Sequence, residues 1–329
     1  MQQIDHQMLE LEDVTLSLYS AGPVSGIPVW LLHGFPECWY SWRHQIHALA
    51  EAGFRVYAPE MRGYGATSAP GETQAYDLIS LCGDIRQAMD ALGQKRVIMV
   101  GHDWGAPVAW HLALLEPDRI ALVCGMSVPF AGRPRQPAIK RMREAFADRF
   151  HYILYFQEPG RAEAELAEDI PRTMRLVMHG MSGAHTDGSL VQDKPRDARW
   201  LDDRVDPGVP PDWCSAEAFE VYVRTFERSG FHGPLNWYRN FERTWERTAG
   251  LAGQLINQPA LFIIGDRDPV GALEAHTITR MPSVVPRVEQ HVIPDCGHWL
   301  QGEKPEEVNR LLLDFIERHR AEVFEGNHS

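Results

Sequence analysis

Short, continuous apolar runs alternate with amphipathic stretches over the first 130 residues and again after residue 255. Such runs predict buried β-strands, because a strand covered on both faces needs no polar side. They fall at residues 27–32, 54–58, 97–100, 120–126, 260–264 and 288–293. A weaker alternation over residues 9–20 predicts two further short strands, separated near Asp13.

Helical periodicity separates several of these strands, at residues 39–52, 77–92 and 107–116. Asp77 is placed to cap the second of these helices, and Pro305 marks the start of a last helix. One face of that last helix is apolar, with Val308, Leu311, Leu312, Phe315 and Ile316. Strands that alternate with helices predict an α/β fold with a mostly parallel sheet of about eight strands, covered on both faces.

The strand pattern is interrupted in the middle of the chain. Residues 131–255 contain no convincing strand and are rich in arginine, proline and aromatic residues, with helix-like stretches at 138–150, 216–228 and 235–247. We therefore expect a helical lid (cap) at 131–255, inserted into an α/β core that is formed by residues 1–130 and 256–329.

Composition narrows the function classes. The formal net charge of −13 disfavours nucleic acid or an anionic membrane as a partner. The five cysteines are scattered and form no C-x-x-C pair, which favours a reducing compartment without a disulfide framework. The N-terminus does not resemble a signal peptide, and no apolar run is long enough to span a bilayer. We therefore expect a cytoplasmic enzyme.

The sequence Gly101-His102-Asp103-Trp104-Gly105 joins a predicted strand to a predicted helix. Two glycines four residues apart permit the sharp turn called a nucleophile elbow, which raises its central residue at the end of the sheet. Here that residue is an aspartate, whose carboxylate can attack the sp3 carbon of an epoxide or alkyl halide and form an ester. The alternative is that Asp103 only caps the following helix.

Two further candidates follow later strands. Asp268 comes after the strand at 260–264, and His298 comes after the strand at 288–293. The order nucleophile, acid, histidine is that of α/β-hydrolases, and strand ends gather catalytic groups at one edge of a parallel sheet. Singly, Asp268 is typical of a turn and His298 of a hydrogen-bonded loop. Asp266 is a rival for the acid, but we favour Asp268.

His33-Gly34-Phe35-Pro36 follows an earlier strand. The backbone amides of Phe35 and Trp104 are candidates for an oxyanion hole, since Pro36 has no N–H to donate. His33 and His102 show no metal-ligand spacing with His298, so we interpret both as hydrogen-bonding loop residues and expect no metal site.

Taken together, these runs resemble the α/β-hydrolase-fold epoxide hydrolases, including the hydrolase domain of the mammalian soluble enzyme. The likeness extends from about residue 10 to residue 320. It includes two stretches of the lid, which are its most specific part. The runs that carry it are HGFPE at 33–37, YSWR at 40–43, RGYG at 62–65, GHDWG at 101–105, YILYFQEPG at 152–160, GPLNWYRN at 233–240 and DCGHW at 295–299.

The resemblance implies two lid tyrosines above the nucleophile, which match Tyr152 and Tyr238. Two phenols can donate hydrogen bonds to an epoxide oxygen as it gains negative charge. Packing in the lid is the alternative role for Tyr152 and Tyr238, and Tyr155, only three residues from Tyr152, is easily mistaken for it. Phe35, Trp104 and Trp299 are further expected to line an apolar substrate channel.

The resemblance therefore implies an epoxide hydrolase that forms vicinal diols from small lipophilic epoxides and water, without a cofactor, as a monomer or homodimer. A haloalkane or haloacid dehalogenase shares the Asp-His-Asp core but has no use for a tyrosine pair. A non-catalytic binding protein or hormone receptor on the same scaffold is a third possibility, although a complete set of catalytic side chains speaks against it.

Overall fold

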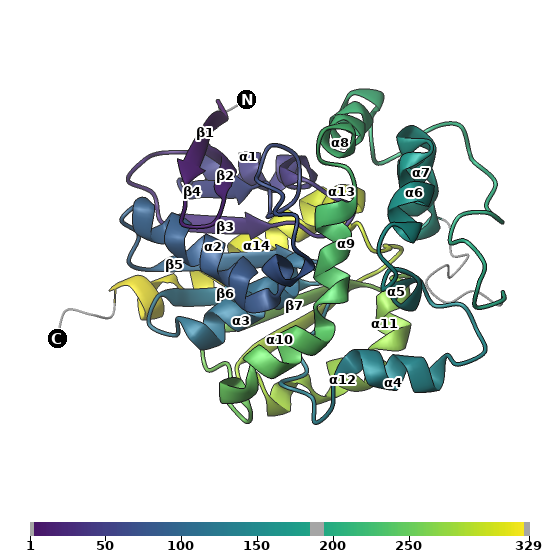
Figure 1. Cartoon of the computed structure of the whole chain (residues 1–329). Helices are drawn as coiled ribbons and strands as arrows, with labels where there is room; N and C mark the ends of the chain where they lie inside the picture. Colours follow the sequence, from purple (N-terminus) through teal and green to yellow (C-terminus); the bar gives the residue numbers. More distant parts are fainter. Residues whose placement is uncertain (1–2, 185–193, 326–329) are drawn as a thin grey trace.

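A computed structural model of the chain describes residues 3–184 and 194–325. Its centre is one eight-stranded sheet with the order β1-β2-β4-β3-β5-β6-β7-β8 (Figure 1). The strands are β1 (Asp5–Glu10), β2 (Thr15–Ala21), β3 (Pro28–Leu32), β4 (Arg55–Pro59), β5 (Val97–His102), β6 (Ile120–Met126), β7 (Ala260–Gly265) and β8 (Val288–Ile293).

Most of this sheet is parallel. Strands β4, β3, β5, β6, β7 and β8 all run in the same direction. Strand β2 is antiparallel to both β1 and β4, so a hairpin forms one edge of the sheet. The predicted number of strands and the mostly parallel topology are confirmed. Because β5 lies in the middle of the sheet, its carboxyl end lies between those of β3 and β6.

Helices cover the two faces of the sheet. Helices α2 (Leu78–Ala91) and α3 (Gly105–Leu115) pack on one face, and α1 (Arg43–Glu51) and α14 (Pro305–Arg320) pack on the other. The predicted apolar stripe of α14 is buried in the second of these two cores. No helix of the described residues is both long and apolar enough to cross a membrane.

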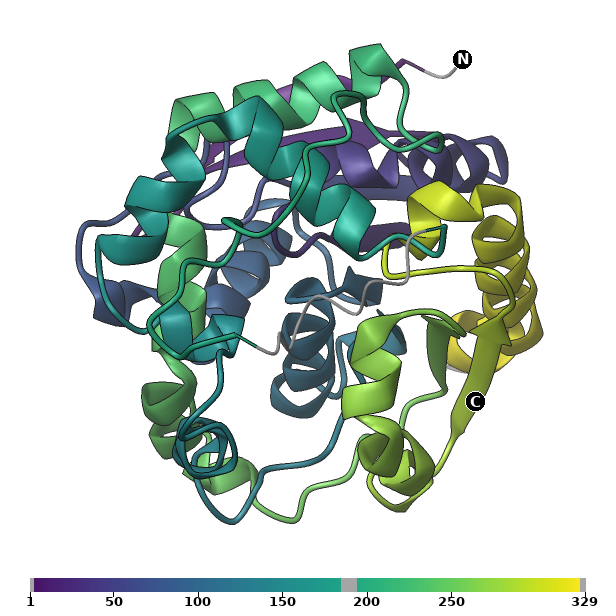
Figure 2. The ribbon, with the colours of Figure 1, turned by 90° about the vertical axis from the view of Figure 1, so that its right-hand side faces the viewer.

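Helices without any strand occupy the described parts of residues 131–255, which are 131–184 and 194–255 (Figures 1 and 2). They are α4 (Ala138–Ala145), α5 (Tyr152–Tyr155), α6 (Arg161–Ala167), α7 (Ile170–Gly180), α8 (Ala216–Ser229), α9 (His232–Arg239) and α10 (Phe241–Arg247). Short helices α11 (Pro269–Leu273) and α12 (Ala275–Arg280) follow β7, and α13 (Leu300–Glu303) precedes α14.

Several predicted helix boundaries differ from the structure. The helix expected at 39–52 begins as a 3-10 turn, Trp39–Trp42, before α1. The one expected from residue 107 begins at Gly105. The one expected at 235–247 is two helices, α9 and α10, which meet at Asn240. The Asn240 side chain donates to the carbonyl oxygens of Thr73 and Asn236, so a contact with another segment accompanies the break.

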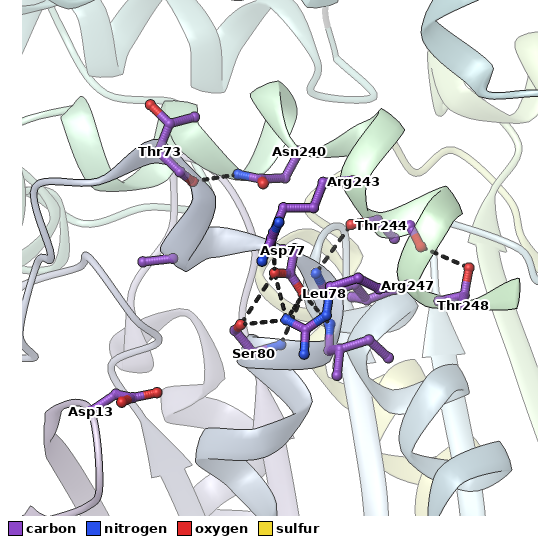
Figure 3. Close-up of polar contacts among 12 residues, drawn as sticks. Asp13, Thr73, Asp77, Leu78, Ser80, Asn240, Arg243, Thr244, Arg247 and Thr248 are labelled. Carbon is purple, nitrogen blue, oxygen red and sulfur yellow. Dashed lines mark hydrogen bonds and ion pairs between the residues drawn. The ribbon is translucent and has the colours of Figure 1, made fainter. Parts of the chain in front are cut away.

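Helix α10 is attached to the core by a buried carboxylate, that of Asp77 (Figure 3). Asp77 accepts hydrogen bonds from Arg243 Nε at 2.9 Å and from Arg247 Nη1 at 2.7 and 2.8 Å. The same side chain caps α2 through the backbone amides of Ile79 and Ser80, as predicted. Burial opposes ionisation of Asp77, but the two arginines and the capping amides hold its pKa below the ordinary 3.8.

Three neighbouring hydrogen bonds reinforce this attachment. Asn240 donates to Thr73 O, the backbone amide of Leu78 donates to Thr244 Oγ1, and Trp237 Nε1 donates to Arg62 O. These bonds place α9, which carries Tyr238, in a fixed position over the segment between β4 and α2.

We expect Asp77→Asn to lower the free energy of unfolding by about 1–3 kcal/mol, because asparagine keeps the helix cap but removes the charge that both arginines bind. The control is Asp90→Asn on the same helix, whose carboxylate is 59% exposed and pairs with Arg119 at 2.8 Å. We expect less than about 0.5 kcal/mol there, because solvent screens an exposed pair.

The two variants can be compared by urea unfolding at several pH values. Because the pKa of Asp77 is lowered in the folded protein, its contribution is complete at neutral pH. It is lost only as the pH falls below about 4, through the folded pKa. Equal losses for the two variants would contradict this account of the attachment.

Candidate active site

The turn between β5 and α3 places Asp103 in a conformation that side chains rarely adopt. Its φ is +49°, in the left-handed region. The turn is crowded on both sides. A Cβ on Gly101 would lie 2.1 Å from the Gly105 carbonyl oxygen, and a Cβ on Gly105 would lie 2.0 Å from the Leu32 carbonyl oxygen. Larger residues at either position would displace the backbone, so the two glycines permit the predicted elbow.

Asp103, Asp268 and His298 meet at the carboxyl ends of β5, β7 and β8. His298 Nδ1 lies 3.0 Å from Asp268 Oδ2, and His298 Nε2 lies 3.5 Å from Asp103 Oδ2. The side chains of Asp268 and His298 are buried, while that of Asp103 is 15% exposed. Asp266, the rival acid, instead accepts a hydrogen bond from the backbone amide of Cys296. The structure therefore places Asp268, and not Asp266, beside the histidine.

The two carboxylates determine the charge of His298. Burial alone lowers the pKa of an imidazole, but the charge of Asp268 and the nearby Asp103 carboxylate raise the pKa of His298 well above 6.5. The pKa of Asp268 is lowered, because the charge of His298 outweighs the effect of burial. The two carboxylates therefore favour the protonated form of His298 in the resting site.

The backbone amide of Phe35 faces the nucleophile. It donates a hydrogen bond of 2.7 Å to Asp103 Oδ1, which agrees with the position expected of an oxyanion-hole donor. The Trp104 amide, the second expected donor, directly follows Asp103 in the chain, and its role stays a prediction.

A buried polar network behind Asp103 was not assigned a role from the sequence. Glu37 accepts hydrogen bonds from the Gly34 amide at 3.0 Å and from Gln301 Nε2 at 2.5 Å, and it lies 2.7 Å from His102 Nδ1. His102 Nε2 lies 2.8 Å from the carbonyl oxygen of His298. The network joins the loops that carry Phe35 and His298. The sequence feature that pointed to this network is Glu37, the acidic residue directly after the His-Gly-Phe-Pro run.

His33 and His102 are both hydrogen-bonded, as expected, but only His33 lies in a loop, because His102 is the last residue of β5. His33 Nδ1 lies 3.0 Å from the Gly34 carbonyl oxygen, and His33 Nε2 accepts from the Met61 amide. Burial lowers the pKa of His33 to about 4, so the ring is neutral. Over residues 3–184 and 194–325, no cluster of three or more His, Cys, Asp or Glu side chains has the geometry of a metal site.

A cavity of about 400 Å³ lies beside Asp103 and is lined by Tyr152 and Tyr238. The rings of the two tyrosines are 5.9 Å apart, and Trp104 lies edge-on to Tyr238 at 5.0 Å. Burial, and then the charge of Asp103, raise the pKa of both phenols above the ordinary 10. Both are therefore protonated at neutral pH and available as hydrogen-bond donors.

Three other aromatic candidates are not among the described residues that line this cavity. Trp299 packs against the His298 ring at 4.8 Å and donates its indole N–H to the Met178 carbonyl oxygen. The Phe35 ring packs edge-on to Tyr238. Tyr155 contacts Phe150 and Arg161. None of the three is among the described residues that line the cavity, so we propose no direct substrate contact for their side chains.

Sequence reasoning missed much of the cavity wall. It comprises Pro107, Val128, Ala138, Met142, Phe146, His151, Ile153, Phe241, Val270, Leu273 and Glu274, in addition to Asp103, Trp104 and the two tyrosines. These residues come from α3, α4, α5, α10, α11 and the loops beside them. In Figure 2, helices of the described parts of residues 131–255 lie on one side of the blue helix α3, and α11 and α12, in yellow-green, lie on the other side. Of these wall residues, only Val270 and Glu274 could have been suspected from the sequence, because they lie close to Asp268 in the chain.

A family model described as alpha/beta hydrolase fold matches residues 27–305. Epoxide hydrolase A of Mycobacterium tuberculosis strain H37Rv is 44% identical over 312 residues, which cover 94% of this chain and 96% of that protein. The chain belongs to the epoxide hydrolases of the α/β-hydrolase fold. Bifunctional epoxide hydrolase 2 of Sus scrofa is 40% identical over 299 residues, 89% of this chain and 52% of that protein.

Solved structures of epoxide hydrolases share the whole fold. Epoxide hydrolase A from Mycobacterium thermoresistibile superposes with a TM-score of 0.89 and is 43% identical, over 96% of this chain and 98% of that chain. An epoxide hydrolase from an endophytic Streptomyces superposes with a TM-score of 0.92 at 37% identity, over 96% of each chain. The resemblance stated from the sequence motifs is therefore confirmed for the family and the fold.

In this epoxide hydrolase we expect Asp103→Asn to lower the pKa of His298 by at least about one pH unit, because it removes one of two nearby negative charges. The measurement is an NMR titration with labelled histidine, and the internal control is His111, a half-buried ring that hydrogen-bonds to the Pro107 carbonyl oxygen. An unchanged pKa of His298 would contradict the proposed coupling to Asp103.

Proposed function

We propose that this epoxide hydrolase converts small lipophilic epoxides into vicinal diols through a covalent ester on Asp103. One observation carries the proposal. The Asp103 carboxylate, on a sharp turn, lines the same cavity as two protonated phenols, and Nε2 of the buried His298 lies 3.5 Å from Asp103 Oδ2. The comparisons support epoxide hydrolysis, and the chemistry of these side chains supports the route.

The first step is ring opening. Oδ1 of Asp103 accepts the Phe35 amide, so Oδ2 is the oxygen that attacks a ring carbon. The carbon–oxygen bond of the epoxide breaks, and its electron pair moves to the epoxide oxygen. Tyr152 and Tyr238 donate hydrogen bonds to that oxygen, and one of them supplies the proton. The products are an ester on Asp103 and a hydroxyl group on the neighbouring carbon.

The second step is hydrolysis of the ester. Esterification removes the charge of Asp103, so the pKa of His298 falls and its proton is released to restore the phenol. The neutral imidazole, oriented by Asp268, then takes a proton from water, and the water attacks the ester carbonyl carbon. The Phe35 amide, with that of Trp104, stabilises the oxyanion on Oδ1. The ester bond breaks, and the leaving oxygen, the former Oδ2, takes the proton of the hydroxyl group that came from water. The diol departs, Asp103 is again a carboxylate, and His298 again carries the proton that it took from water.

The arrangement of the two parts fits this route. We propose that residues 131–255 act as the lid and residues 1–130 and 256–329 as the core, so that the nucleophile and the phenols come from different parts. The cavity between them is mostly apolar, which suits a lipophilic epoxide. Each proposed step uses side chains and backbone amides of this chain and one water molecule.

The tyrosine pair distinguishes this function from a dehalogenase. An epoxide oxygen becomes an alkoxide unless it is protonated, whereas a halide leaves as a stable anion and needs no proton. Two protonated phenols beside the nucleophile therefore favour an epoxide as the substrate over an alkyl halide. The assembled Asp103, His298 and Asp268 likewise favour an enzyme over a receptor on the same scaffold.

We expect Tyr152→Phe and Tyr238→Phe each to reduce kcat/KM for diol formation from styrene oxide by roughly tenfold or more, and the double variant to lose at least about 10³-fold. The matched control is Tyr155→Phe, three residues away and outside the cavity wall, which we expect to change the rate less than about twofold. Full activity of the double variant, or halide release without diol formation by the wild type, would overturn the proposal.

A further inference from the structure

The charges around the cavity are of one sign. Its ionisable wall residues in the described structure are Asp103, His151, Tyr152, Tyr238 and Glu274, and no lysine or arginine is among them. Both tyrosines are protonated and neutral at neutral pH. The wall therefore offers a substrate two carboxylates, one of which is the nucleophile.

Glu274 carries a charge that the proposed mechanism does not use. It is the half-buried residue that ends α11, and its backbone amide donates to the Val270 carbonyl oxygen at 2.8 Å. Within residues 3–184 and 194–325, its carboxylate has no ion pair. Its charge also contributes to the raised pKa of Tyr152, after burial and the charges of Asp103 and Asp268. Glu274 therefore acts electrostatically on the site of ring opening.

Nearby cations do not neutralise this charge. The His151 ring is in the wall, but its Nδ1 accepts the Ile153 amide at 3.2 Å, and burial lowers its pKa to about 4. The ring is therefore neutral at pH 7. Arg149 lies over the Phe146 ring at 5.9 Å, but it is exposed to solvent and outside the wall. The basic residues of α4, which are Lys140, Arg141 and Arg143, are also exposed.

We propose that Glu274 makes this enzyme select neutral or cationic lipophilic epoxides and reject epoxides that bear a carboxylate. An epoxy acid in the cavity would lose part of its hydration against apolar walls. It would also meet the unpaired charge of Glu274 and the carboxylate of Asp103, whose partner His298 is not part of the cavity wall. The inference rests on the proposed function and names the substrate class of the same site. Glu274 is a specificity residue here, and no reaction step requires it.

The test compares three aliphatic epoxides of equal length that end in a carboxylate, a carboxamide or an ammonium group. The carboxamide has nearly the shape of the carboxylate without its charge. In Glu274→Gln we expect kcat/KM for the acid, divided by that for the amide, to rise roughly five- to thirtyfold, as for unit charges about 8 Å apart at an effective dielectric constant of about 20–40.

Two further results identify the effect as electrostatic. In Glu274→Gln, kcat/KM for the ammonium compound divided by that for the amide should fall, because the sign of the interaction is reversed. Both changes should shrink in 0.5 M salt, where charges more than about 4 Å apart are largely screened. The control is Glu144→Gln on α4, which removes the same charge from an exposed residue outside the cavity wall. We expect its ratios to equal those of the wild type.

An unchanged acid-to-amide ratio in Glu274→Gln, or an equal change in Glu144→Gln, would overturn the assignment. Turnover of the amide keeps this result separate from the proposed function. If the wild-type enzyme and Glu274→Gln both convert the amide to a diol while the ratios stay equal, only the specificity inference fails. If the wild type forms no diol from the amide, the proposed function fails and the inference fails with it.

Discussion

The close approach of three backbone segments around Asp103 determines where every other group of the site must lie. The turn after β5 brings Gly101 against Gly105, and Gly105 against the end of β3, which leaves no space for a side chain at either glycine. Asp103 is held at positive φ between them, at the carboxyl edge of the sheet. The Phe35 amide lies on one side of its carboxylate and His298 on the other. A looser turn would separate the nucleophile from both.

The charges around this carboxylate connect the two halves of the proposed reaction. The charges of Asp268 and Asp103 raise the pKa of His298 and favour its protonated form, so it is a poorer base while Asp103 carries its charge. Ester formation removes one of these charges. His298 therefore becomes a better base when there is an ester to hydrolyse. The phenols act in the first half alone, where the epoxide oxygen gains charge. In this account, one change of charge on Asp103 separates nucleophilic attack from base catalysis.

Much of this site could be predicted from short, consecutive segments of the sequence. Asp103 and Asp268 each follow a recognisable strand. The carboxyl ends of parallel strands lie at one edge of the sheet, so the nearness of these two residues could be predicted from the strands alone, without the lid. The apolar stripe of α14 and the capping role of Asp77 are likewise properties of a few consecutive residues. The lid tyrosines needed the family resemblance, because nothing in their own segments distinguishes Tyr152 from Tyr155.

The remaining features depend on contacts between distant segments. Helices α9 and α10 separate at Asn240, whose side chain binds Thr73 about 170 residues earlier in the chain. The position of Trp299 behind His298 likewise depends on the Met178 carbonyl oxygen in the lid. Helix α7, of 11 residues, had a start signal in Asp169 and the proline in its first turn, but it lies in a part of the chain without a strand pattern and was not predicted. Such features follow from packing, which periodicity does not encode.

The central claim is that Asp103 becomes covalently bonded to the substrate and is freed by water. The most direct measurement is a single turnover with excess enzyme in water enriched in heavy oxygen, followed by mass analysis of the peptide that contains residues 101–105. The account predicts one heavy oxygen in the Asp103 carboxylate and an unlabelled diol, because the diol takes its new oxygen from Asp103. A labelled diol with an unlabelled Asp103 would show direct attack by water and would contradict the account.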